Sequence, residues 1–355
     1  MIHNLLDGVH LDEISISKET RELSEFVRDT SHSLVDRIES YEDIISLEVG
    51  DTSLSRARNI ERELDLRQLY LKFEGGNPSG TQKDRIAFAQ VHDALRRGFD
   101  VITVATCGNY GVAVAIAAQL AGLRCVIYIP ENYHTERVKE MELTGAEVRR
   151  HPGSYEDTVV FSSQEAIQYD WYDANPGGQN TPLQIIAYSE IAHEIYDQLR
   201  DAPKMVAVPV SNGTLLAGIY RGFVSLYKRG KTSRIPKMIA ASSSHKNPII
   251  TSFKKNLDYC EDLKPEQIKE TKVNEPLINW HSFDGEEALW AIRQSGGNAF
   301  HISDQKMMKY ARLLAEKEGL RVLPASTAGL VALLEMHQKE PFEPDRFVAV
   351  LTGKD

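Results

Sequence analysis

Short apolar runs rich in β-branched residues alternate with longer helix-forming stretches through most of the chain. Runs of this kind occur at 101–105, 125–130, 205–210 and 347–351. They suit strands that are buried on both faces of a sheet. Between them, stretches such as 112–121 and 183–199 have the length and composition of helices. Strands that alternate with helices predict βαβ units and a parallel sheet.

The first 45 residues differ from this pattern. They are polar and charge-rich, but apolar side chains recur in them at helical spacing: Leu23, Phe26, Val27, Leu34, Val35 and Ile38. We therefore predict an N-terminal extension of one or two amphipathic helices, which packs on the body of the protein or on a partner subunit. The next apolar run, 44–48, predicts a strand, whereas the polar segment 242–285 has no periodicity that predicts its structure.

Length and charge restrict the function. The 355 residues are enough for two domains or one large α/β unit. A net charge of −10 argues against a nucleic acid or an acidic membrane as a partner, because both require concentrated positive charge. No apolar run approaches the roughly 20 residues of a membrane span. The first residues also lack the basic and apolar stretches of a signal peptide, so neither membrane attachment nor secretion is expected.

Cysteine and histidine usage predicts a cytoplasmic protein without a metal site. The cysteines Cys107, Cys125 and Cys260 are odd in number and have no CxxC spacing, which fits thiols in a reducing cytoplasm. The eleven histidines show no HxxxH or HxH grouping, so no metal is expected.

Four loops of small residues follow predicted strands and are the candidates for chemistry. They surround Lys83, Asn109, Gly213 and Thr352. In open α/β sheets, ligands bind beyond the carboxyl ends of the strands, so we expect these loops to meet at one crevice. Lys83 stands between a strand-like run and a helix-like run, where its amine could attack a carbonyl. The alternative is a surface lysine in an ordinary turn.

The other loops leave alternatives open. The loop 211–215 either binds a phosphate through its backbone N–H groups and a helix dipole, or is only a tight turn. It matches neither the Walker pattern nor GxGxxG, which argues against a nucleotide. Asn109 either offers a donor and an acceptor to a ligand or caps the next helix. Cys107 is a poor candidate for a nucleophile, because no histidine stands beside it in the sequence.

Together, these loops resemble those of fold-type II pyridoxal-phosphate enzymes, and of threonine synthases in particular. Residues 77–85 are Asn-Pro-Ser-Gly-Thr-Gln-Lys-Asp-Arg, where the family has Asn-Pro-Thr-Gly-Ser-Phe-Lys-Asp-Arg. Further similar stretches, with the family pattern in brackets, are 50–54 (Gly-x-Thr-Pro-Leu), 107–109 (Ser-Gly-Asn), 209–214 (Pro-x-Gly-Asn-Gly-x), 323–327 (Glu-Pro-Ala-Ser-Ala) and 351–355 (Leu-Thr-Gly-x-Gly-Leu-Lys-Asp, shortened here). The likeness runs from about residue 45 to the C-terminus.

The resemblance implies a fold and a cofactor. The fold is α/β, like that of the tryptophan synthase β subunit, with two open parallel-rich domains and pyridoxal 5′-phosphate in the cleft between them. The expected domains are the helical extension 1–45, a large cofactor-binding domain from 46–85 and 186–355, and a small domain from 86–185. Proteins of this family are usually homodimers, so a homodimer is expected.

The resemblance also implies roles for individual residues. Lys83 binds the cofactor covalently as a Schiff base, Asn109 bonds the oxygen at position 3 of its ring, and Thr352 bonds the ring nitrogen. The residues expected at the cofactor phosphate are Ser211, Asn212, Gly213, Thr214 and Leu215. The residues expected at the amino-acid substrate are Ser79, Thr106, Cys107, Gly108, Tyr110 and Asn175.

The stretch 173–181 departs from the family pattern. Threonine synthases that use O-phosphohomoserine carry a Ser and an Arg here, which help to bind the substrate phosphate. This chain has Ala174 and no arginine, and Asn180 replaces a lysine. A phosphate dianion without its bidentate arginine loses a strong contact. Tyr110 also fills a position that often has a small hydroxyl residue or a histidine, and so narrows the pocket.

The resemblance predicts a pyridoxal-phosphate-dependent lyase of amino-acid metabolism. Such an enzyme eliminates phosphate from O-phosphohomoserine and hydrates the product to threonine, or performs a related elimination or replacement on another amino acid. One alternative is a threonine or serine dehydratase, or a cysteine synthase-like β-replacement enzyme. A non-catalytic ligand-binding protein on the same scaffold is an alternative of another class, but it would have no need of the lysine.

Overall fold

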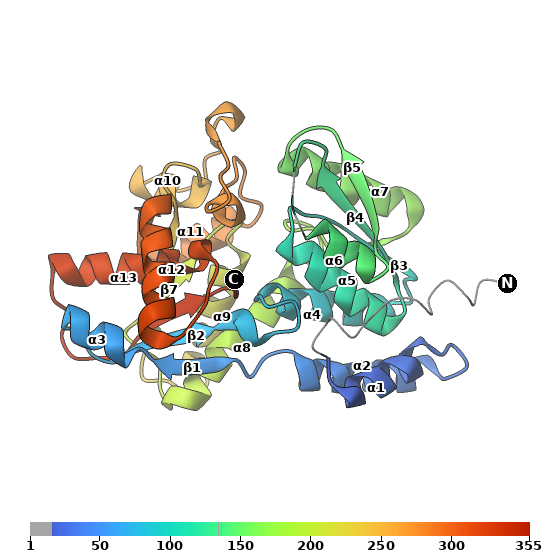
Figure 1. Ribbon diagram of the computed structural model, residues 1–355, viewed down its shortest axis with the longest axis horizontal. Coiled ribbons are helices and arrows are strands. Elements are labelled where there is room, and N and C mark those ends of the chain that lie inside the picture. The colour runs from blue at the N-terminus through green and yellow to red at the C-terminus, as the bar shows by residue number, and fades with distance from the viewer. Residues whose placement is uncertain (1–15, 134, 136) are drawn as a thin grey trace. The chain divides into compact units, whose positions relative to one another are not determined.

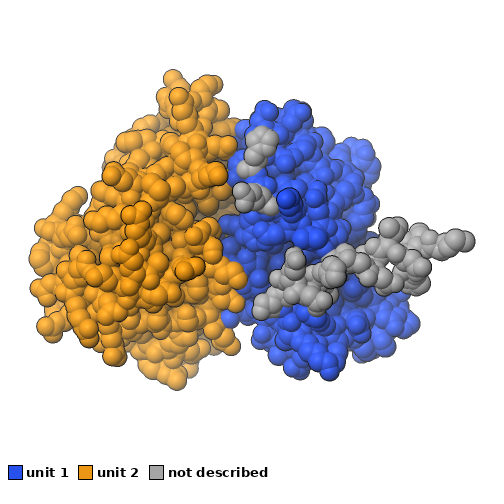
Figure 2. Space-filling model, viewed as in Figure 1, with its two compact units in different colours: residues 1–50, 77–184 blue, residues 51–76, 185–355 orange. Residues whose placement is uncertain are grey.

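The expected alternation of strands and helices is present in the structure, a computed structural model that describes residues 16–133, 135 and 137–355. The described residues form two compact units, coloured separately in Figure 2. Unit 1 contains the described residues of 1–50 and 77–184, and unit 2 contains residues 51–76 and 185–355.

The two units differ from the predicted domains. The prediction set residues 1–45 apart and placed 46–85 with the C-terminal half of the chain. In the structure, the described residues up to 50 and the whole lysine loop, 77–85, belong to unit 1. The division into an extension, a large domain and a small domain stays a prediction.

Unit 1 is built on a parallel sheet. In its described residues the strand order is β5-β4-β3-β6. The strands are β3 (Val101–Ala105), β4 (Arg124–Pro130), β5 (Glu147–His151) and β6 (Tyr172–Asp173), and the helices that follow the first fifty residues are α4 (Lys83–Arg96), α5 (Asn109–Ala121), α6 (Val138–Leu143) and α7 (Tyr155–Tyr169). The Ala-rich helix α5 is buried along nearly its whole length, and Gly122, with φ of 73°, ends it in the left-handed conformation.

The N-terminal helices are part of unit 1 and pack on its other helices (Figure 1). Helix α1 (Lys18–Arg28) lies against α5, and α2 (Leu34–Glu48) lies against α4. The Tyr41 hydroxyl donates a hydrogen bond of 3.0 Å to a carbonyl oxygen of α5, that of Ala117. The strand predicted at 44–48 is wrong, because these residues form the end of α2. Tyr41 and Ile44 are both fully buried, so the three-residue spacing of a helix continues into this run.

Unit 2 is built on a mixed sheet with the order β1-β2-β10-β7-β8-β9 in the described residues. Strand β1 pairs antiparallel with β2, and the other neighbours are parallel. The strands are β1 (Ser53–Arg56), β2 (Leu69–Phe73), β7 (Met205–Pro209), β8 (Lys237–Ser243), β9 (Asn298–Ile302) and β10 (Phe347–Leu351). The helices are α3 (Arg58–Leu64), α9 (Thr214–Lys228), α10 (Pro248–Lys254), α11 (Gly285–Gln294), α12 (Asp304–Glu318) and α13 (Ala328–Lys339), while α8 (Thr181–Leu199) begins in unit 1 and ends in unit 2.

Strands β7 and β10 are neighbours in the middle of the unit 2 sheet. Every residue of β7 and β10 is buried, as expected for strands covered on both faces. Because β7 and β10 are parallel neighbours, the loops that follow them lie at the same edge of the sheet. Across the described residues, no helix combines the length and apolar composition that crossing a membrane requires.

Candidate functional site

Lys83 is the first residue of α4, and the loop before it is fixed by hydrogen bonds. The N–H of Gly80, which has φ of 82°, donates to the carbonyl oxygen of Asn77 at 2.8 Å and closes a turn. The N–H of Lys83 donates to Thr81 Oγ1 at 3.2 Å. Lys83 Nζ lies 5.4 Å from the centre of the Tyr110 ring. The structure therefore places the amine of the predicted lysine beside the aromatic ring of another predicted site residue.

Asp84, the next residue of α4, orients the same loop. Its carboxyl group accepts hydrogen bonds from Ser79 Oγ at 2.7 Å and from Ser79 N at 3.0 Å. Asp84 is fully buried, and this desolvation raises its pKa from 3.8 to about 7, although hydrogen bonds from Ser79 and Thr81 and the charge of Arg137 oppose the rise. The hydroxyl of Ser79, predicted to contact substrate, is thus directed by a carboxyl group one residue beyond the lysine.

Asn109 is the first residue of α5, at the carboxyl end of β3. The turn before it is organised by Thr106, whose Oγ1 accepts from the N–H groups of Gly108 at 3.1 Å and Gly111 at 3.3 Å. Asn109 Oδ1 accepts a hydrogen bond of 2.5 Å from Arg137 Nη1. Neither the composition nor the motifs of the sequence had indicated Arg137.

Two predicted substrate residues are buried in unit 1. Tyr110 is 7% exposed, and its hydroxyl donates to the carbonyl oxygen of Ala174 at 2.8 Å. Asn175 is 1% exposed; its Oδ1 accepts from Ala105 N at 2.7 Å and its Nδ2 donates to Asp173 Oδ1 at 2.6 Å. The ring of Tyr110 is therefore the part that lies near the lysine amine, and the Asn175 side chain connects neighbouring strands. Their roles towards substrate stay predictions.

In unit 2, the loop 211–215 leads directly from β7 into α9. Gly213 has φ of 103°, and a Cβ there would lie 2.7 Å from Ala288 Cβ and 2.8 Å from the carbonyl oxygen of Asp284. Only glycine fits this conformation and this space. The first N–H groups of a helix have no partner within the helix, and its dipole favours an anion. The loop therefore has the features of a phosphate site.

Residues from the segment 242–285, among them Asn247 and Asp284, fix this loop. Asn247 Nδ2 donates to the carbonyl oxygen of Ser211 at 3.0 Å. The backbone N–H of Asp284 donates to the carbonyl oxygen of Asn212 at 3.1 Å, and the Asp284 carboxylate accepts from the hydroxyl of Thr214. The polar segment whose structure the sequence did not predict thus supplies the groups that fix the phosphate-type loop.

Thr352 follows β10 and so lies at the same sheet edge as the loop 211–215. Its Oγ1 is 3.0 Å from Ser326 Oγ, and Ser326 is fully buried. Ser326 Oγ also accepts from the N–H of Gly353 at 3.0 Å. Ser326 therefore determines the orientation of the Thr352 hydroxyl.

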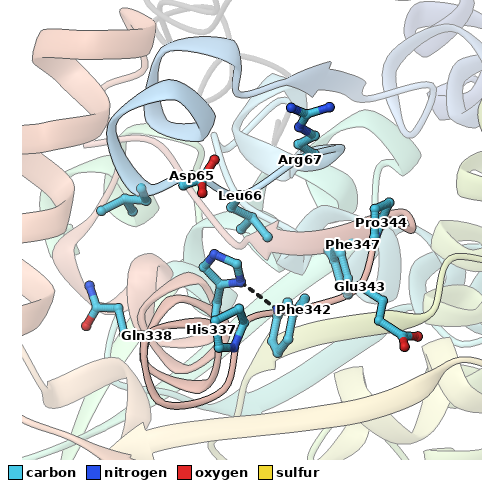
Figure 3. A pocket seen from close by; sticks show the side chains of 11 residues that line it. Asp65, Leu66, Arg67, His337, Gln338, Phe342, Glu343, Pro344 and Phe347 are labelled. Atoms are coloured by element: carbon cyan, nitrogen blue, oxygen red, sulfur yellow. Dashed lines mark hydrogen bonds between the residues drawn. The ribbon is translucent and has the colours of Figure 1, made fainter.

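A separate cavity of about 450 Å³ lies in unit 2, between the end of α3 and the end of α13 (Figure 3). Phe342 and His337 both line this cavity, and the N–H of Phe342 donates to Nδ1 of His337 at 2.9 Å. The cavity is lined by Phe347, the first residue of β10, so it lies at the amino end of that strand. Because ligands of open α/β sheets bind at the carboxyl ends, and no predicted site residue lines this cavity, it is not the candidate active site.

The predicted site residues therefore fall into two groups. Unit 1 brings together Lys83, Ser79, Asn109 and Tyr110, and Thr106, Cys107 and Gly108 belong to the turn at Asn109. Unit 2 brings together the loop 211–215 and Thr352 at one sheet edge. No group of three or more His, Cys, Asp or Glu side chains that could bind a metal occurs within the described residues.

Comparison with known proteins finds one enzyme family and, within the curated proteins, threonine synthases. Residues 45–353 match the family model described as pyridoxal-phosphate dependent enzyme. The chain is 31% identical to the threonine synthase of Methanocaldococcus jannaschii over 313 residues, which are 87% of this chain and 76% of that protein. It is 29% identical to the threonine synthase of Bacillus sp. (strain ULM1), over 87% of this chain and 84% of that protein.

Solved structures of several activities share the fold. A maize serine racemase superposes with a TM-score of 0.72 at 19% identity, covering 90% of this chain and 94% of that one. A cysteine synthase from Entamoeba histolytica superposes with a TM-score of 0.68 at 20% identity, covering 87% of each chain. At such identities the likeness concerns the fold alone, and it confirms the expected fold class.

Proposed function

The chain belongs to the pyridoxal-phosphate-dependent enzyme family of fold type II, and we propose that within it the protein is a lyase that acts on an amino acid as threonine synthase does. The reaction would eliminate a group from the side chain of the substrate and add water or another nucleophile in its place. The observation that carries the proposal is the lysine loop. Lys83 begins α4, Asp84 directs the loop, and Asn109 is linked to it through Arg137.

The residues present fit pyridoxal phosphate. The loop 211–215 offers a helix N-terminus and a glycine that no larger residue can replace, which suits the phosphate. We propose that Lys83 binds the aldehyde carbon, that Asn109 donates from Nδ2 to the ring oxygen, and that Thr352 meets the ring nitrogen. When bound, the cofactor supplies an electron sink for the negative charge that develops at the substrate Cα.

The chain's own groups would move the proton. We propose that Lys83 Nζ acts as the general base that takes the proton from the substrate Cα. Thr352 is a neutral hydroxyl, which does not stabilise a protonated ring nitrogen as a carboxylate would. Such a moderated electron sink suits elimination or replacement at Cβ or Cγ better than transamination.

A second candidate is favoured by the stretch 173–181. Ala174, which replaces the family serine, is fully buried, and its carbonyl oxygen accepts from Tyr110. Asn180, which replaces the family lysine, donates from Nδ2 to the carbonyl oxygen of Asp173 at 2.6 Å. These neutral groups do not supply the charge that a substrate phosphate requires. The second candidate is therefore a threonine or serine dehydratase, or a β-replacement enzyme that acts on a serine activated without phosphate, such as O-acetylserine.

One experiment tests the cofactor chemistry. The purified protein should take up pyridoxal phosphate with a visible absorption band, and borohydride should attach the cofactor to Lys83, as located by mass spectrometry of peptides. Lys83→Ala should lose both the attachment and turnover but keep the fold. Lys18→Ala, which removes an exposed lysine from α1 in the same unit, is the matched control and should behave as the wild type. A protein that never takes up the cofactor would refute the proposal.

A substrate panel decides between the two candidates. The protein is incubated with O-phosphohomoserine, threonine, serine and O-acetylserine, and phosphate release, 2-oxo acid formation and the cofactor spectrum are followed. Phosphate release from O-phosphohomoserine supports the threonine synthase-like lyase. A 2-oxo acid from threonine or serine, or replacement on O-acetylserine, supports the second candidate. The resemblance further suggests a cytoplasmic homodimer, which sedimentation and cell fractionation test.

A further inference from the structure

Arg137 joins the lysine loop to the turn at Asn109. Its Nη1 donates to Asn109 Oδ1 at 2.5 Å, and its Nη2 donates to the carbonyl oxygen of Ser79 at 3.2 Å. Nε and Nη2 also pair with the Glu140 carboxylate at 3.1 and 2.8 Å. The side chain is only 24% exposed. The planar guanidinium, with donors in several directions, can bridge these groups as a lysine ammonium on a flexible stem cannot.

The bond to Arg137 decides which end of the Asn109 amide is available to a ligand. An asparagine side chain has an acceptor oxygen on one side and a donor NH₂ on the other. Arg137 occupies the oxygen, since a guanidinium can only donate. The amide therefore presents its NH₂ group elsewhere, and a ligand group that meets this NH₂ must be an acceptor.

The same contact places the positive charge of Arg137 on the Asn109 amide, which is the group that would bind the acceptor. A hydrogen bond from a guanidinium polarises the amide and makes its N–H groups stronger donors. An acceptor oxygen with negative charge gains most from this arrangement. The ring oxygen of pyridoxal phosphate, which can ionise, is an acceptor of this kind.

We propose that Arg137 is a positioning residue for the cofactor: it fixes the Asn109 amide so that Nδ2 donates to the ring oxygen, and it connects this amide to the lysine loop through Ser79. The inference rests on the proposed function of the site and names a residue that the motifs do not contain. Arg137 touches neither the cofactor nor the reacting atoms in this proposal. Its effect passes through Asn109.

A double-mutant cycle on cofactor affinity tests this step. Apo-protein is prepared for the wild type, Arg137→Met, Asn109→Ala and the double variant, and each is titrated with pyridoxal phosphate by absorbance and fluorescence. Arg137→Met should weaken binding roughly tenfold in the wild-type background and not at all in the Asn109→Ala background. Arg137→Lys retains the charge but not the fork of donors, and should also weaken binding. It serves as the second variant if Arg137→Met fails to fold.

Arg124→Met is the matched control. Arg124 lies in the same unit, pairs with Glu147 at 2.6 Å as Arg137 pairs with Glu140, and is 53% exposed. The Arg124→Met variant should bind the cofactor as tightly as the wild type. If Arg137→Met weakens binding equally in both backgrounds, or does not weaken it, the inference is wrong while the proposed function stands. If the wild type itself does not bind the cofactor, both are wrong.

Discussion

The buried carboxyl group of Asp84 should make the stability of the protein depend on pH in an unusual direction. Its pKa is raised from 3.8 to about 7, mainly by desolvation. A carboxyl group with a raised pKa in the folded state contributes its stability below the unfolded pKa of about 4 and loses it as the pH rises through the folded pKa. The wild type should therefore lose stability between about pH 4 and pH 7 because of this group.

The size of the effect follows from the two pKa values. Each pKa unit corresponds to about 1.4 kcal/mol, so full ionisation of Asp84 lowers the free energy of unfolding by about 4 kcal/mol. About 3 kcal/mol of this loss falls between pH 5 and pH 8. Asp84→Asn removes the titration, while the amide retains an oxygen for Ser79 N and a donor for Ser79 Oγ. The difference in unfolding free energy between variant and wild type should thus rise by about 3 kcal/mol over this range.

Denaturant unfolding of both proteins at pH 5, 6, 7 and 8 measures this difference. Asp93→Asn is the control on the same helix. Burial raises the pKa of Asp93, but hydrogen bonds from Arg96, Tyr172 and Arg97 outweigh it and lower the pKa overall. The stability that the Asp93 carboxylate contributes is therefore lost only as the pH falls below about 4. The difference in unfolding free energy between Asp93→Asn and the wild type should thus stay constant from pH 5 to 8. A flat difference for Asp84→Asn would refute the reasoning, because it would mean that hydrogen bonds keep Asp84 ionised despite its burial.

Three other substitutions test the site. Gly213→Ala should lower the free energy of unfolding by about 2 kcal/mol and weaken cofactor binding, because its Cβ would lie 2.7 Å from another Cβ at a φ of 103°; a denaturation midpoint like that of the wild type would contradict this. Ser326→Ala should cost about 1–3 kcal/mol, since it leaves a buried backbone N–H unpaired, and it should change the absorption spectrum of the bound cofactor, because the Thr352 hydroxyl loses its partner. Tyr110→Phe removes the donor to the carbonyl oxygen of Ala174 and should cost about 1 kcal/mol; it retains the ring beside the lysine, so unchanged cofactor affinity is expected in the same titration.

The strands and most helices could be predicted from local patterns. Runs such as 101–105 and 347–351 are buried on both faces, and burial of that kind requires continuous apolar residues. The run 44–48 was assigned to the wrong class because a short apolar run does not distinguish a strand from a buried helix end. The packing of α2 against its neighbouring helices decides it, since Tyr41 and Ile44, three residues apart, are both fully buried.

The candidate site could be predicted only where its residues are close together in the chain. The lysine loop and the turn at Asn109 are both continuous stretches that resemble family motifs. Arg137 lies 28 residues after Asn109, and Ser326 lies 26 residues before Thr352. No local pattern connects a side chain to a partner at that separation. Such contacts arise from the fold, so the sequence motifs do not contain the residues that orient the site, and the roles of the residues expected to touch the cofactor stay predictions.

The polar segment 242–285 shows why a stretch without periodicity can still be essential to the site. In a trans peptide, the carbonyl oxygen of one residue and the N–H of the next point in opposite directions. Asn247 binds the carbonyl oxygen of Ser211, and the N–H of Asp284 binds that of Asn212. The N–H groups that follow these two carbonyl groups therefore point away from the groups that bind the carbonyl oxygens. The contact to Ser211 requires the side-chain amide of Asn247, whereas the contact to Asn212 uses only the backbone of residue 284, so the segment fixes the loop partly by residue type and partly by its own conformation.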